Sequence, residues 1–207
     1  MAQFFQIHPD NPQPRLIRRT AEILLDGGVI VYPTDSSYAL GCQIGAKEAM
    51  ERIRRIRDLD EKHNFTLVCR DLSEITTYAR IDNQAFRLLK SLTPGPYAFI
   101  FQGTKQVPRR LMHPRRKTIG IRVPDHEIPR ALLAELDQPI LSTTMQIPGD
   151  ELPLTDPYEM RDILDRQVDL VIDGGFCGLE STTVVDMTQE PPAVLRVGKG
   201  DAALFAA

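Results

Sequence analysis

Cysteine and histidine are scarce in this chain, and no hydrophobic run is long enough to cross a membrane. The 207 residues include three cysteines and four histidines, with no CxxC or HxxxH spacing. We therefore expect no protein-bound structural metal. The beginning, MAQFFQIHPD, lacks the charged start and long apolar run of a signal peptide. We expect a cytoplasmic protein that does not contact a membrane.

Familiar motifs for phosphate binding and catalysis are missing as well. No GxxxxGK followed by Ser or Thr occurs, and Gly198-Lys199-Gly200 lacks the upstream glycine and following hydroxyl of that loop. GxGxxG follows none of the expected strands, and no GxSxG nucleophile elbow is present. If the chain binds ATP, it does so by a different arrangement.

Length and composition describe a globular chain. Hydrophobic residues make up 42% of it, and the net charge is −3. The length lies near the upper end of ordinary single-domain sizes, so we predict one domain over residues 1–207. Helical and strand patterns alternate without a linker or repeat. This predicts an α/β fold with a twisted, mixed parallel and antiparallel sheet that is flanked by helices around a basic cavity.

The elements are expected from hydrophobic periodicity and from breakers. Pro12 suits an early position of a first helix, and Asp156 with Pro157 predicts the start of another. Further helices are expected near 46–58, 72–79, 83–91 and 127–136. Strands are expected at 29–32, 65–69, 97–102, 118–123, 139–143, 169–172, 182–187 and 193–197.

Charge is distributed unevenly along the chain. Residues 83–124 include no acidic residue and carry +9, so the rest of the chain carries −12. This split favours a positive surface or cavity facing a nucleotide, a phosphate or RNA. A solvated basic loop is the alternative, and for the segment 109–117 both interpretations stay open. The candidate RNA or phosphate surface comprises Arg109, Arg110, Arg115, Arg116 and Lys117.

Hydroxyl groups gather where strands are expected to end. In VIVYPTDSSYALG, residues 29–41, Pro33 stops a strand and is followed by Thr34, Asp35, Ser36 and Ser37. Open α/β sheets bind ligands at the carboxyl ends of strands. A turn that satisfies its own backbone is the alternative for this cluster alone.

Four further segments repeat this theme. On the helix near 46–58, Arg57 falls beside the apolar face whereas Arg55 points away from it. An arginine beside a core needs an anion or carbonyls as partners, although a single one often snorkels to solvent. Hydroxyl clusters recur at 142–144 and 181–183, and Arg196 interrupts an apolar strand. Together, these segments point to one polar site.

With these segments in place, the chain resembles the Sua5/YciO/YrdC family over nearly its whole length. The family pattern YPT-(E/D)-T-x-YGLG corresponds to YPTDSSYALG, and K-x-R followed by NPL corresponds to Arg55-Ile56-Arg57 and NFTL. TIGIRVP, Ser142-Thr143-Thr144, STTVVD and LRVG match the remaining motifs. The longer segment ending in HNFTL is typical of the YciO branch.

The resemblance implies a chemistry. Members of this family with established activity condense L-threonine, bicarbonate and ATP to threonylcarbamoyl-AMP, which is used to modify adenosine 37 of tRNA. Mg²⁺ would arrive with ATP as the substrate complex. By motif, the residues around threonine would be Ser36, Arg122, Ser142 and Ser181. Those lining the nucleotide would be Arg55, Arg57, Asn64, Thr118, Thr144, Thr155 and Arg196.

Three positions depart from the family pattern. Arg55 stands in place of a lysine, Thr144 in place of an asparagine and Cys69 in place of a histidine. A planar guanidinium does not replace a compact ammonium, and threonine lacks the two amide hydrogens of asparagine. We therefore expect weak or altered synthase activity. The alternatives are a protein that binds double-stranded RNA or tRNA without synthesis, and a hydrolase of threonylcarbamoyl-AMP.

Overall fold

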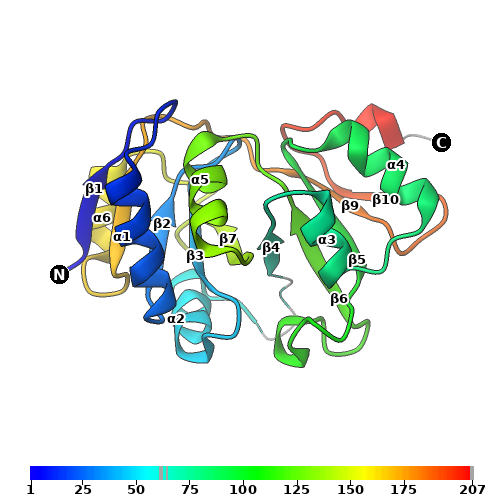
Figure 1. Ribbon diagram of the computed structural model, residues 1–207, viewed down its shortest axis with the longest axis horizontal. Helices are drawn as coiled ribbons and strands as arrows, with labels where there is room; N and C mark the ends of the chain where they lie inside the picture. Colours follow the sequence, from blue (N-terminus) through cyan, green and yellow to red (C-terminus); the bar gives the residue numbers. More distant parts are fainter. Residues whose placement is uncertain (61–62, 64, 206–207) are drawn as a thin grey trace.

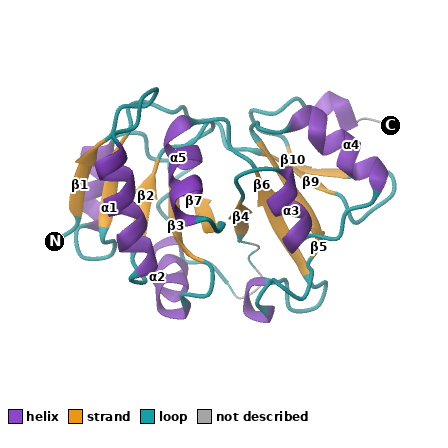
Figure 2. Ribbon diagram, in the orientation of Figure 1, coloured by secondary structure: helices purple, strands orange, loops and turns teal. Residues whose placement is uncertain are grey.

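One mixed sheet organises the molecule, and helices flank both of its faces (Figures 1 and 2). The computed structural model describes residues 1–60, 63 and 65–205. The strands are β1 (Gln3–Gln6), β2 (Val29–Tyr32), β3 (Ala39–Gln43), β4 (Thr66–Val68), β5 (Tyr97–Gln102), β6 (Thr118–Arg122), β7 (Ile140–Thr144), β8 (Leu170–Asp173), β9 (Thr183–Asp186) and β10 (Ala193–Arg196). The helices are α1 (Pro14–Leu25), α2 (Lys47–Arg57), α3 (Leu72–Tyr78), α4 (Asn83–Leu92), α5 (Glu127–Leu136) and α6 (Pro157–Leu164), with short 3₁₀ turns η1 (Arg109–Leu111) and η2 (Ala202–Phe205).

The strand order is β1-β8-β2-β3-β7-β4-β6-β5-β9-β10. β8 pairs in parallel with β1 and β2, as β4 does with β6 and β5 with β9. The other neighbours are antiparallel. The predicted single α/β domain with a mixed, helix-flanked sheet is therefore confirmed. None of the helices in the described ranges is long and apolar enough to span a membrane.

Most expected elements are present, and two strands are new. β2, β5 and α5 have the predicted bounds. Asp156 caps α6 by accepting a hydrogen bond from the backbone N–H of Tyr158. The first helix begins at Pro14 rather than near Pro12, because Gln13 occupies the extended N-cap position. β1 and β3 were not predicted.

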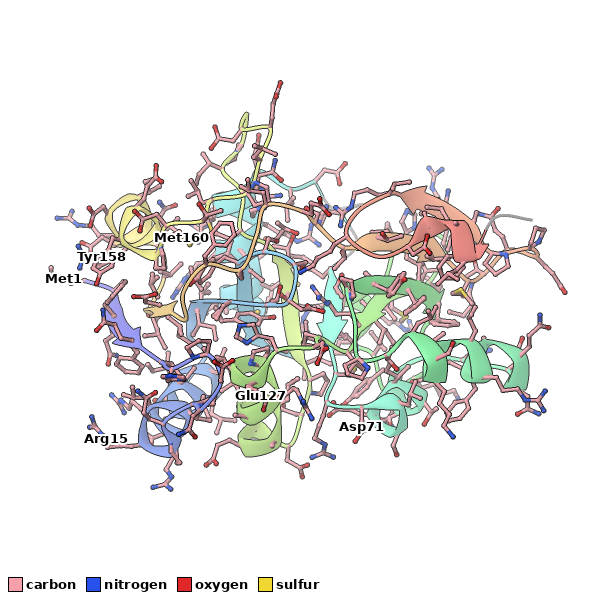
Figure 3. The ribbon with its side chains drawn as sticks, turned by 90° about the horizontal axis from the view of Figure 1, so that it is seen from above. Met1, Arg15, Asp71, Glu127, Tyr158 and Met160 are labelled. Carbon is pink, nitrogen blue, oxygen red and sulfur yellow. The ribbon has the colours of Figure 1, made fainter. Side chains whose placement is uncertain are left out.

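The pleat of the strands separates two apolar cores. Along β2, Val29 and Val31 join the core beneath α2, α3, α4 and α6, whereas Ile30 and Tyr32 join the core beneath α1 and α5. Around β2, Figure 3 shows α1, with Arg15, and α5, with Glu127, across the sheet from α6, with Tyr158 and Met160. Both cores are continuous with the sheet, so strand register decides which side chains reach each of them.

A row of fully buried side chains crosses six strands on the first face. Each member faces the next in register. The row consists of Cys42, Leu141, Leu67, Ile121, Phe99 and Val185, all 0% exposed. On the opposite face, the neighbouring row holds Ser142, Thr66, Gly120 and Ile100. Small and polar residues there leave space above the sheet.

β3 gives a test of the packing. Leu40 is fully buried in the first core, whereas Leu25, at the end of α1, is 52% exposed. We expect Leu40→Ala to lower the free energy of unfolding by about 2–5 kcal/mol. Leu25→Ala is the matched control and should change it by less than about 0.5 kcal/mol. Urea denaturation measures both, and equal effects would contradict the assignment of β3 to the core.

Candidate functional site

A cavity of about 280 Å³ opens on the face of the sheet that carries the small residues. Its walls come from β3, β4, β5, β6, β7, β9 and β10, so segments distant in sequence share one site. Among the described residues, the lining contains no aspartate or glutamate. Polar lining residues are Thr34, Ser37, His63, Thr66, Arg122, Ser142, Thr143, Thr144, Thr182 and Arg196. Such a site suits an anionic ligand with several hydrogen-bonding groups.

The floor of the cavity depends on strand register. Thr66 of β4 lies between Ser142 of β7 and Gly120 of β6. A Cβ atom at Gly120 would lie 3.0 Å from Thr66 Oγ1 and 3.2 Å from the carbonyl oxygen of Phe65. Ser142 is anchored from below, because its Oγ donates to the Leu40 carbonyl at 3.0 Å and lies 2.8 Å from the hydroxyl of Tyr32. The floor is therefore shaped by groups that hold one another in place.

The turn between β2 and β3 forms one wall. Thr34 Oγ1 accepts hydrogen bonds from the N–H groups of Ser36 and Ser37 and donates to the Ser37 carbonyl at 2.6 Å. Thr34, Ser36 and Ser37 are all buried. The turn does satisfy its own backbone, as one interpretation of the sequence expected. It also places Thr34 and Ser37 on the cavity wall.

Arg122 already has an ionic partner within the chain, Asp35, rather than leaving its guanidinium free for a ligand. Its Nη2 pairs with Asp35 Oδ1, and both side chains are 9% exposed. Nη1 donates to Ser36 Oγ at 3.3 Å, while the buried Nε has no hydrogen-bond partner among the described atoms. Sequence reasoning placed Arg122 against a threonine carboxylate and assigned Asp35 no role. In the structure, a carboxylate of the chain itself already balances the charge of this arginine.

Two other arginines bring positive charge without a described carboxylate partner. Arg196 lines the cavity, and its Nε and Nη2 donate to the carbonyl and Oγ1 of Thr182 at 3.0 and 2.9 Å. Arg57 donates from Nη1 to the Gln146 carbonyl, and its buried Nε has no described partner. Burial lowers the pKa of both guanidinium groups, and the charge of Arg122 also lowers that of Arg196. These are the cations that a bound anion would neutralise.

His63 is a cavity residue that sequence reasoning missed as a site. Its Nε2 lies 3.5 Å from Thr143 Oγ1. Burial lowers the pKa of His63, and the positive charges of Arg57, Arg54 and Arg196 lower it further. The imidazole is therefore neutral at pH 7. The only available signal was the HNFTL segment, because one histidine in a short charged loop has no periodicity.

The remaining predicted residues divide into three groups. Ser142 and Thr144 line the cavity with Arg122 and Arg196. Ser36 contacts the lining through Thr34 and Arg122. Thr118, which is buried, and Thr155 and Ser181, which are half-buried, do not line the cavity, and neither does Arg57. Asn64 lies outside the described residues. Cys69, at the departure from the family histidine, is buried, and burial raises its thiol pKa.

Arg55 does not face this cavity. It is exposed on α2 and lines a separate depression with Arg52, Arg166 and Asp169. Arg57, two residues later, lies on the other side of the helix, and its charge acts on His63. The helical period of 100° per residue had indicated this division. The family lysine position is thus occupied here by a side chain that points elsewhere.

The Asp35–Arg122 pair provides the prediction for this site. Neutralising one member of a buried ion pair leaves the other charge unpaired. Asp35→Asn should therefore lower the free energy of unfolding by about 3 kcal/mol at pH 7. In the control, Glu127→Gln removes the charge of an ion pair whose two side chains are each 51% exposed, with an expected change below about 1 kcal/mol. Equally small losses in denaturant titrations would show that the pair is solvated.

Comparisons with known proteins agree with this architecture. A family model for Sua5, YciO and YrdC proteins, described as telomere recombination, matches residues 22–198. YciO of Escherichia coli strain K12 is 59% identical over 205 residues, which cover 99% of this chain and 100% of the relative. A threonylcarbamoyl-AMP synthase of Pyrococcus abyssi is 28% identical over 185 residues, which are 88% of this chain and 54% of the synthase.

Solved structures extend the comparison. The crystal structure of E. coli YciO matches with a TM-score of 0.97 at 59% identity, and both chains are covered completely. The structure of P. abyssi Sua5 complexed with L-threonine matches with a TM-score of 0.86 at 25% identity, over 94% of this chain and 57% of that one. The chain therefore belongs to the Sua5/YciO/YrdC family.

Proposed function

We propose that the cavity binds an adenylate: AMP joined to a carboxyl or carbamoyl group, with threonylcarbamoyl-AMP as the family's example. The observation that carries this proposal is the pair Arg57 and Arg196, partly desolvated cations without a described carboxylate partner, of which Arg196 lines the hydroxyl-rich cavity and Arg57 acts on its lining residue His63. Charge-assisted hydrogen bonds from arginine suit phosphate oxygens. The relatives named threonylcarbamoyl-AMP synthase and the threonine complex of P. abyssi Sua5 support the same ligand class.

The balance of charge favours an adenylate over ATP. Asp35 neutralises Arg122, which leaves Arg57 and Arg196 as the main described cations near the cavity. The phosphate of an adenylate carries one negative charge, whereas a triphosphate carries several and would arrive with Mg²⁺. Arg55, at the family lysine position, lines another depression. We infer that condensation of ATP, bicarbonate and threonine is a weak activity of this chain.

A threonine group bound in the cavity would lie beside an arginine, Arg122, that is already partly paired with Asp35. The carboxylate of Asp35 holds Nη2 of Arg122, so the threonine carboxylate must share this arginine, whose buried Nε has no described partner. Hydroxyl groups of Ser37, Ser142 and Thr144 surround the same space. This arrangement fits a compact polar group better than a large apolar one.

Calorimetric titration with AMP tests the adenylate site. We expect measurable binding, because two cations desolvated in the protein interact strongly with phosphate. Arg196→Ala and Arg57→Ala should each weaken the affinity by about tenfold or more, since a hydrogen bond to a charged group contributes roughly 1.5–3 kcal/mol. Mg·ATP should bind no more tightly than AMP.

Arg55→Ala is the matched control for this experiment. It removes the same positive charge from α2 on the side away from the cavity. Its affinity for AMP should stay within about twofold of the unmodified protein, because solvent and salt screen an exposed charge. A flat titration, or equal losses for Arg55→Ala and Arg57→Ala, would refute the assignment of the site.

The basic segment supports a second candidate function, binding of RNA through its phosphates. Arg109, Arg110, Arg115, Arg116 and Lys117 are all exposed. Beside them, Arg80, Lys105, Arg109 and Lys117 line a depression of about 620 Å³ whose described lining has no acidic residue. A cluster of cations on one surface is the electrostatic footprint of nucleic-acid binding. The depression shares no residue with the adenylate cavity.

Charge reversal tests this candidate. The triple variant Arg109→Glu, Arg115→Glu and Arg116→Glu should lose binding of double-stranded RNA in a filter assay at low salt, with an unchanged melting temperature. Loss follows because each phosphate contact contributes to affinity through counterion release. Reversal of three exposed arginines on α1, at positions 15, 18 and 19, is the control and should retain binding. Retained binding in the first variant would show that the segment is only solvated.

A further inference from the structure

Among the residues that the structure describes, the His63 side chain has no strong hydrogen-bond partner. Its Nε2 lies 3.5 Å from Thr143 Oγ1, at the outer limit of a hydrogen bond. One edge of the ring contacts Phe65 in a T-shaped arrangement, with ring centroids 5.8 Å apart. The side chain lines the same cavity as Arg196 and the hydroxyl groups of β7. A ring nitrogen is therefore available to a molecule bound there.

The charges around His63 favour the neutral imidazole, which can accept a proton. Arg57 and Arg54 on α2 and Arg196 on β10 act against its protonation, whereas Asp60 favours it. The effect of burial is larger than any of these charges and lowers the pKa below 6.5. A neutral imidazole next to cations is a proton acceptor at neutral pH, while the cations remain available to a phosphate.

We propose that the cavity hydrolyses adenylates, with His63 as the general base that activates water. This activity rests on the adenylate binding proposed above and goes beyond it. Nε2 of His63 accepts a proton from water as the water oxygen bonds to the carbonyl carbon of the mixed anhydride. The bond from that carbon to the bridging phosphate oxygen breaks, and its electron pair leaves with AMP. The products are AMP and the free acid, which for threonylcarbamoyl-AMP is N-carboxythreonine.

The composition of the cavity favours water as the nucleophile. The described lining holds no carboxylate and no cysteine that could attack the anhydride. Thr66, Thr143 and Thr144 provide hydroxyl groups that can hold a water molecule near His63. Arg57 and Arg196 would stabilise the negative charge that develops on the leaving phosphate, as preorganised cations do in other hydrolytic sites. We assign Thr143 the role of a positioning residue, because it lies beside the base.

The test follows AMP release from threonylcarbamoyl-AMP that is made with a separate synthase and freed of it. The unmodified protein should release AMP well above the spontaneous rate. His63→Gln should lose about a hundredfold or more of kcat, in line with the usual contribution of a general base. Its affinity for AMP by calorimetry should stay within about threefold. His8→Gln, which changes an exposed histidine that does not line the cavity, is the control and should retain full activity.

Further readouts separate a base from a structural residue. The kcat of the unmodified protein should fall in the acid range as His63 gains a proton, and His63→Gln should lack this dependence. Thr143→Val should keep at least about a tenth of the activity. AMP released in ¹⁸O-water should carry no label, because water attacks carbon.

The results that overturn the proposal are distinct from those that refute adenylate binding. Spontaneous rates with normal AMP affinity overturn hydrolysis and leave the adenylate site standing. Full activity of His63→Gln, label in AMP, or complete loss in Thr143→Val overturns the assigned mechanism. No AMP binding by the unmodified protein refutes the adenylate site and the hydrolysis together.

Discussion

The pleat of six neighbouring strands is the constraint on which the core and the cavity both depend. Because side chains alternate between faces, the register that buries Leu141, Leu67 and Phe99 in one core necessarily places Ser142, Thr66 and Ile100 on the other face. A slip of one residue in β7 or β4 would bring a hydroxyl group into the core and a leucine into the cavity. The stability of the fold and the shape of the site are therefore set by the same hydrogen-bonded ladders, and the site needs no separate scaffold.

The pair Asp35–Arg122 links the turn after β2 to the end of β6 across this face. Burial of two charged groups costs desolvation free energy, and this cost is offset only when the geometry is good and further hydrogen bonds are present. Here Ser36 and the backbone N–H of Asp125 provide them, at 3.3 and 3.1 Å. The pair has a second effect, because it removes one cation from the electrostatic balance of the cavity. The charge offered to a ligand then comes from Arg57 and Arg196, two arginines whose local environments contain carbonyl oxygens rather than carboxylates.

Periodicity predicted long or strongly apolar elements well and short ones poorly. The apolar patterns of α5 and β2 each fit one type of element, and the bounds predicted for both elements were correct. β3 reads ALGCQ, a short segment that was not predicted as a strand. In the structure its glycine is required inside the sheet, since a Cβ at Gly41 would lie 2.8 Å from Ile140 Cγ2 and from Tyr32 Cε1. The helical period correctly separated Arg57 from Arg55, while motif matching alone grouped them. His63 and the ion pair of Asp35 could not be predicted, because both depend on contacts between segments far apart in sequence.

The same cations that lower the pKa of His63 would attract the phosphate of a ligand, so binding and basicity are linked. A bound adenylate adds a negative charge beside Arg57 and Arg196 and offsets part of their effect on the imidazole. The pKa of His63 then rises, so a stronger base is present when the substrate is in place. Once the anhydride is broken, the phosphate of AMP carries more negative charge than it did in the substrate, and the imidazole has just gained a proton. Attraction between the two holds the product, and release requires the proton to leave. The chemistry proposed for this cavity therefore predicts that AMP dissociates faster as the pH rises.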